Sequence, residues 1–92
     1  MNELALLLDM LKVDLGIMQT TAYDERLSQC LQSAKKAIEE EGASDLDALS
    51  NSADAQLIVM YAAWLWRKRD TFEGMPRMVR YALNNRVFKG DA

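Results

Sequence analysis

The segment from Ser52 to about Asp70 restricts the possible folds most, because it has the pattern of a helix that is apolar on nearly every side. Asn51 or Ser52 can cap this helix, and Asp54 places an acid in its first turn. One broad apolar face consists of Leu57, Ile58, Tyr61, Trp64 and Leu65. A separate apolar stripe on the other side of the helix consists of Val59, Ala63 and Trp66. Since such a helix must be surrounded, we expect it to be central to the fold or to lie between subunits.

A leucine-rich first helix is predicted from the cap Asn2 to about Leu15, where Gly16 ends it. Its leucines recur at the spacing of one helical face, at positions 4, 7, 8, 11 and 15. A second apolar stripe on the other side consists of Leu6, Met10 and Val13. Because a surface helix needs only one apolar stripe, the second is more than a small core requires.

The second helix is predicted over residues 22–41, with acids in its first turn and Gly42 at its end. Its apolar residues form one stripe: Tyr23, Leu27, Leu31, Ala34 and Ile38. Residues 43–51 have the composition of a short loop, in which we expect Leu46 and Leu49 to cover the core.

The fourth helix is predicted to begin with Pro76 at its first position, where the missing N–H costs nothing. Its inward face is apolar and consists of Val79, Ala82, Leu83 and Val87. Its outer side carries Arg77, Arg80 and Asn84, with the aromatic residues Tyr81 and Phe88 beside them. Residues 89–92 are expected to form a flexible tail. The sequence thus predicts an all-α fold: one domain over residues 1–92, a small bundle of four main helices with a short loop between the second and the third.

The residue types exclude most catalytic and metal chemistry. The 92 residues include no histidine and one cysteine, Cys30, which excludes intrachain disulfides, His/Cys metal sites and Ser–His or Cys–His pairs. We therefore expect no enzymatic activity and no cofactor. The N-terminus lacks the positive start of a signal peptide, and no apolar run has membrane-spanning length, so we expect synthesis in the cytoplasm and no membrane contact.

The two parts of the chain carry opposite charge. Residues 1–63 contain four basic and eleven acidic side chains, a net charge of −7, and residues 64–92 contain seven basic and three acidic side chains, a net charge of +4. This asymmetry suits either a nucleic-acid contact or a head-to-tail assembly of identical subunits. The cations at 67–69 also complement the C-terminal end of a helix, and those of the fourth helix can equally form a solvated face.

Trp64 and Trp66 cannot both point into one core, because helical positions two apart diverge by about 200°. Trp66 is expected to cover a second surface, either a loop or a neighbouring subunit. Interfaces favour Trp and Arg together, so Trp66 with Arg67 is the leading interface candidate. The full candidate interface joins the two extra stripes to basic and aromatic residues of the C-terminal part: Leu6, Met10, Val13, Val59, Ala63, Trp66, Arg67, Arg69, Arg77, Arg80 and Tyr81.

The order and spacing of several segments carry a resemblance over nearly the whole chain. The segments are Leu-Lys-Val-Asp-Leu-Gly-Ile at 11–17, Tyr23-Asp24, Ala34 and Ile38, Asp54, Tyr61-Ala62-Ala63-Trp64-Leu65-Trp66-Arg67, and Met75-Pro76 followed by Leu83. In this arrangement the chain resembles the head–tail connector proteins of long-tailed bacteriophages, also described as head-completion, adaptor or DNA-packaging proteins.

The resemblance implies a helical subunit that forms a ring, dodecameric in the virion, beneath the portal protein at the head–tail junction. Such a ring, assembled in the cytoplasm of the bacterial host, extends the DNA channel, helps to retain the packaged DNA and docks the tail-completion or stopper protein. It has no enzymatic activity, and we expect DNA to pass without sequence-specific binding. Since cations lining the channel would hold the DNA back, we expect four acids to lie nearer the lumen than the arginines: Asp24, Glu25, Glu39 and Glu40.

Two other functions remain open. A phage or prophage DNA-binding module, of the small-terminase or repressor type, would use the turn at 71–75 and the basic fourth helix as a helix–turn–helix unit. Salt-dependent binding of duplex DNA would favour it. An enzyme or carrier domain is the other alternative, but the sequence contains no phosphate-cradling glycine loop, metal-ligand spacing or Asp-Ser-Leu carrier site.

Overall fold

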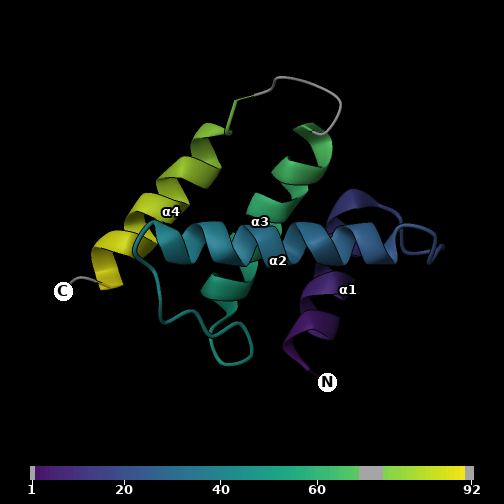
Figure 1. Ribbon diagram of the computed structural model, residues 1–92, viewed down its shortest axis with the longest axis horizontal. Helices are drawn as coiled ribbons and strands as arrows, with labels where there is room; N and C mark the ends of the chain where they lie inside the picture. Colours follow the sequence, from purple (N-terminus) through teal and green to yellow (C-terminus); the bar gives the residue numbers. More distant parts are fainter. Residues whose placement is uncertain (1, 69–73, 91–92) are drawn as a thin grey trace.

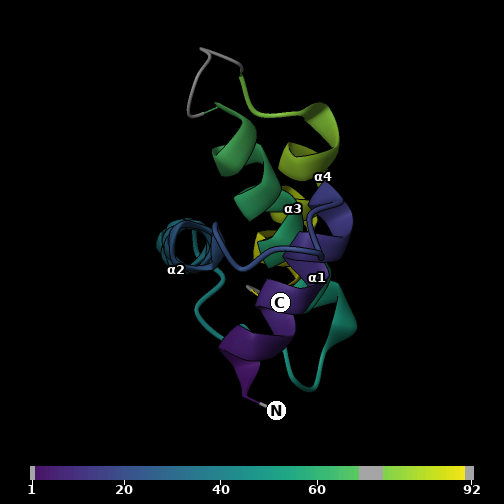
Figure 2. The same ribbon diagram turned by 90° about the vertical axis from the view of Figure 1, so that its right-hand side faces the viewer.

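The third helix, α3 (Ser52–Lys68), lies at the centre of the computed structural model, which describes residues 2–68 and 74–90. The helices α1 (Glu3–Leu15) and α4 (Arg77–Gly90) lie on opposite sides of α3, and α2 (Asp24–Glu40) crosses over it (Figure 1). After a turn of 90°, α2 is seen as one layer and the other three helices as a second (Figure 2). The molecule is therefore flat, with extents of 41 × 34 × 17 Å.

The all-α prediction is confirmed, because the described residues form four α-helices and no strand. We expected a helix that is apolar all round to lie either at the centre of the fold or between subunits. The structure shows the central position, because each of the other three helices packs on α3 within one subunit. The remaining core comes mainly from buried leucines and isoleucine of the surrounding helices: Leu7, Leu11, Leu27, Leu31, Ile38 and Leu83. None of the described helices is long and apolar enough to cross a membrane.

Several predicted helix ends are formed by the expected local groups. The side-chain oxygen of Asn2 accepts a hydrogen bond from the amide of Ala5 at 2.7 Å and caps α1. Gly16 ends that helix in the left-handed conformation, with a φ of 73°. At the start of α3, the side-chain oxygen of Asn51 accepts from the amide of Ala53 at 2.9 Å. These ends follow from neighbouring residues alone.

Other predicted boundaries need correction. The second helix begins at Asp24 rather than near Ala22. The reason is that the Thr20 hydroxyl accepts a hydrogen bond from the Ala22 amide at 3.0 Å, and residues 22–23 form a turn. The backbone of α4 stays helical through Gly90, so the predicted tail begins too early; residues 91–92 lie outside the described part. The predicted end of the third helix near residue 70 also lies outside it.

The loop at 43–51 covers the core in a different way from the prediction. Leu46 packs partly against the core as expected, but Leu49 is exposed. The buried loop residues are Ala43 and Ala48. Their small side chains let the loop backbone lie close to the helices, whereas a leucine at position 49 is left in solvent.

Candidate interaction surfaces

The outer side of α4 carries three large apolar side chains that the described residues leave largely exposed. Met78, Tyr81 and Phe88 are 75%, 69% and 83% exposed. Their spacing places them on one side of the helix with Arg77, opposite the buried Val79 and Leu83. We call Arg77, Met78, Tyr81 and Phe88 the α4 face. Because large apolar side chains gathered on one surface mark contact sites, this face is a candidate interaction surface.

Two other arginines of α4 are already bound within the subunit. Arg80 lies 3.2 Å from a carboxylate oxygen of Glu41, just beyond the end of α2. Arg86 binds Asp54 and the side chain of Asp45 in the 43–51 loop, at 2.6 and 2.9 Å. Part of the opposite charge of the two sequence regions is therefore neutralised within one subunit. The prediction of Arg80 as an interface residue has to allow for its pairing with Glu41.

Asp54, in the first turn of α3, is a buried acid that binds α4 to the rest of the fold. It is 1% exposed and accepts hydrogen bonds from the amide of Asp47 at 3.0 Å and from Arg86. Burial opposes its ionisation, but the hydrogen bonds from Arg86 and Asp47, with the charge of Arg86, outweigh burial and lower the pKa of Asp54 below its ordinary value. The first-turn acid predicted as a helix-start residue is thus also a long-range anchor.

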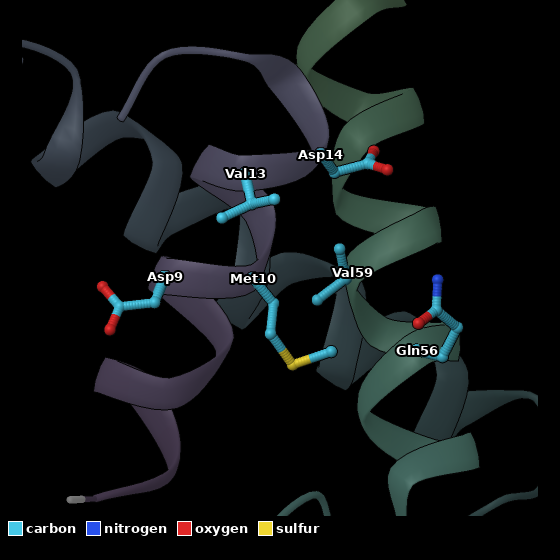
Figure 3. Close-up of a pocket in the computed structure, with 6 residues that line it drawn as sticks. All are labelled: Asp9, Met10, Val13, Asp14, Gln56 and Val59. Carbon is cyan, nitrogen blue, oxygen red and sulfur yellow. The ribbon is translucent and has the colours of Figure 1, made fainter. Parts of the chain in front are cut away.

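A groove of about 370 Å³ lies between α1 and α3. Its lining residues are Asp9, Met10, Val13, Asp14, Gln56 and Val59, and we call it the α1–α3 groove. Met10 and Val59 point toward one another between the helices, and Asp14 lies toward α3 while Asp9 points away from it (Figure 3). The groove therefore combines an apolar floor with two carboxylates, one on either side of Met10 and Val13 (Figure 3).

The structure brings three predicted interface residues together, but it buries one of them, Val59, and a fourth, Ala63. Met10, Val13 and Val59 all line the α1–α3 groove, and Val13 is well exposed. However, Val59 is only 2% exposed and Ala63 only 1%, so the predicted separate stripe on the third helix is wrong as a free surface. At Val59 the reason is that α1 packs on α3, with Met10 of α1 pointing toward this side chain (Figure 3). Leu6, the remaining residue of the first-helix stripe, is half-buried.

Trp66 covers a second surface, as predicted, and the surface is a connecting segment of the same subunit. Its ring meets that of Tyr23 edge to face, with centroids 5.5 Å apart, and it is half-buried. Tyr23 precedes α2 and is itself partly exposed, instead of lying inside as predicted. Arg67 is exposed, and Arg69 lies outside the described residues. The Trp66–Arg67 candidate is therefore weaker than the α4 face.

The four acids expected near a lumen do not form one group. Asp24 is half-buried at the start of α2, and its Oδ1 lies 2.8 Å from the ammonium of Lys12 in α1. This oxygen is buried, and the ion pair with Lys12 compensates its charge there. Glu25, Glu39 and Glu40 are exposed on α2. Only these three are available to face a channel.

Sequence reasoning missed several residues that complete both surfaces. Asp9 and Asp14 lie one residue before and four residues after Met10, which places them beside the apolar stripe. Met78 lies three residues before Tyr81, on the same side of the helix. Both signals are helical spacings that could have been found in the sequence.

Both surfaces combine apolar and charged side chains, as contact sites do. In residues 2–68 and 74–90, no group of three or more acidic or cysteine side chains is placed to hold a metal ion. A second groove, of about 570 Å³, lies between α3 and α4, and in it Arg86 is bound to the two acids of the lining, Asp45 and Asp54. Comparisons with protein-family models, with curated proteins and with solved structures each found no match.

Proposed function

We propose that this chain is a structural subunit of the head–tail junction of a long-tailed bacteriophage, where copies assemble into a ring beneath the portal protein. The observation that carries the proposal is the α4 face, because three large apolar side chains gathered on one side of a helix are left largely exposed by the described residues. Assembly would cover them. The order and spacing of the segments that resemble the connector proteins, and their arrangement in four helices, also support it.

In this function the chain works by position and not by catalysis. The ring extends the DNA channel, helps to retain the packaged DNA and provides a docking surface for a tail-completion or stopper protein. Glu25, Glu39 and Glu40 are exposed on α2 and suit a channel lining, because carboxylates form no ion pairs with passing phosphates. Ring formation as a dodecamer is part of the proposal through the resemblance.

A DNA-binding module has less support. Binding of phosphates by α4 would draw on its arginines, but Arg80 and Arg86 are already paired with carboxylates of the same subunit. Arg77 is the arginine of this helix that forms no ion pair with a described residue. One such cation supplies little of the salt-dependent affinity that non-specific DNA binding requires.

The test is to measure the mass of the purified chain by size-exclusion chromatography with light scattering, alone and with the portal protein of the same phage genome. We expect a complex with the portal that contains many copies of the chain, visible as an added ring by electron microscopy. A chain that remains monomeric and leaves the portal unoccupied would overturn the proposal. Tight, salt-dependent binding to a short DNA duplex, measured by fluorescence anisotropy, would support the DNA-binding module instead.

A further inference from the structure

Two charged side chains stand at the helix end where the backbone dipole opposes their sign. Asp14 lies in the last turn of α1, at the negative end, and Arg77 is the first residue of α4, at the positive end. Neither forms an ion pair with any residue that the structure describes. Each charge therefore disfavours its own helix in an isolated subunit and would be stabilised by an opposite charge from outside.

The surfaces that carry these two charges match each other in chemistry and shape. The α1–α3 groove has an apolar floor with Asp9 and Asp14 beside it. The α4 face has a convex apolar centre with Arg77 at one end. An amphipathic helix that lays its apolar side chains into such a groove is a common mode of recognition, read at spacings of three, four and seven residues.

The two surfaces lie at opposite edges of the molecule, so a subunit cannot satisfy itself. The helices α1 and α4 are on opposite sides of α3 (Figure 1). A contact between two different surfaces of identical subunits is heterologous. Repeated contacts of this kind produce a ring when the rotation between subunits closes.

We infer that the α4 face of one copy docks in the α1–α3 groove of the next copy, with Arg77 facing the carboxylate of Asp14 and with Asp9 on the other side of the apolar floor. This inference rests on the proposed assembly into a ring and specifies the contact that builds it. The positive start of α4 then lies beside the negative end of α1, which favours the pair further. Tyr81 and Met78 cover the apolar floor of the groove.

The size of the contact predicts modest strength in solution. The helix α4 has 14 residues and is about 21 Å long. One helix in one groove buries less than the roughly 800 Å² per partner that is typical of stable complexes. We therefore expect the free protein to associate in a concentration-dependent way, and ring closure or a portal template to stabilise the assembly through several simultaneous contacts.

Sedimentation velocity at increasing protein concentration tests the contact with two charge-reversal variants. The groove variant is Asp9→Arg with Asp14→Arg, and the helix variant is Arg77→Glu. Each variant alone places like charges across the contact and should weaken self-association by about tenfold or more. An equimolar mixture should restore it, because each groove then meets an α4 face of opposite charge in an alternating assembly.

Matched controls separate this contact from general effects. Gln32→Arg with Ser33→Arg adds positive charge at exposed positions of α2, and it should leave self-association within about twofold of the parent. Tyr81→Ser should weaken association, whereas Leu49→Ser, at an exposed leucine of the loop, should not. Circular dichroism of every variant verifies that the helices are retained.

The outcomes distinguish this inference from the proposed function. If the parent forms rings and the groove and helix variants assemble equally well, or if their mixture does not recover, this contact is wrong while ring assembly stands. If the parent neither self-associates nor binds the portal, both fail. Recovery in the mixture, with assembly lost in each variant alone, would establish the pairing of the two surfaces.

Discussion

Replacing Asp54 by asparagine removes one charge and nearly preserves the shape of the side chain. The native carboxylate is buried and accepts hydrogen bonds from the Asp47 amide at 3.0 Å and from Arg86 at 2.6 and 3.4 Å. An asparagine accepts at only one of its two terminal atoms, and its NH2 group would face a guanidinium that also donates. The variant therefore leaves a largely buried cation with too few acceptors.

The expected cost follows from these contacts. Removing one partner of a buried ion pair costs about 3–5 kcal/mol. Asp45 remains as a second acceptor 2.9 Å from Arg86, which favours the lower end, about 3 kcal/mol. Since a domain of this size has a total stability of about 5–14 kcal/mol, the loss is a large fraction of it. The midpoint of thermal unfolding should fall by about 12–24 °C.

Urea unfolding followed by circular dichroism measures this cost, and its pH dependence tests the cause. Because the pKa of Asp54 is lowered in the folded protein, its contribution is complete above about pH 4 and is lost as the pH falls through the folded-state pKa. Parent and variant should converge in acid. The exposed pair of Glu41 and Arg80 is the control, and Glu41→Gln should cost less than about 1 kcal/mol. A difference below about 0.5 kcal/mol at neutral pH for Asp54→Asn would refute the reasoning.

Two further predictions concern the helix ends and the second buried ion pair. Gly42→Ala should lower the unfolding free energy by about 1–3 kcal/mol, because φ is 121° and an added Cβ would lie 3.2 Å from the Val87 side chain. Gly16→Ala, with φ 73° and open space around it, should cost only about 1 kcal/mol. Both glycine variants are compared by thermal unfolding, and a cost for Gly16→Ala equal to or larger than that for Gly42→Ala would contradict this ranking. Lys12→Met should cost about 1–3 kcal/mol by leaving the Asp24 carboxylate without its cation. Adding Asp24→Asn should recover part of that loss in urea unfolding, and no recovery would argue against the pair.

Local patterns were sufficient to predict the helices and most of their ends. The side chains of Asn2 and Asn51 bond to amides two or three residues later, and Gly16 adopts its left-handed conformation directly after α1. The hydrogen bonds of a helix also join residues close in sequence. A stretch of sequence therefore contains all the groups that decide whether a helix forms there, and where local side chains compete, as Thr20 does before α2, the boundary shifts by two residues.

The sequence by itself determined that four helices form and that the third must be surrounded, whereas tertiary structure alone decided what surrounds it. The apolar character of Val59 required a cover, and only packing showed that α1 supplies part of it through Met10. Likewise, a basic α4 could have paired with any of several acids, but Arg86 reaches Asp54, 32 residues away. The physical reason is that hydrophobicity and charge specify the kind of partner, while the crossing of distant helices selects the individual residue.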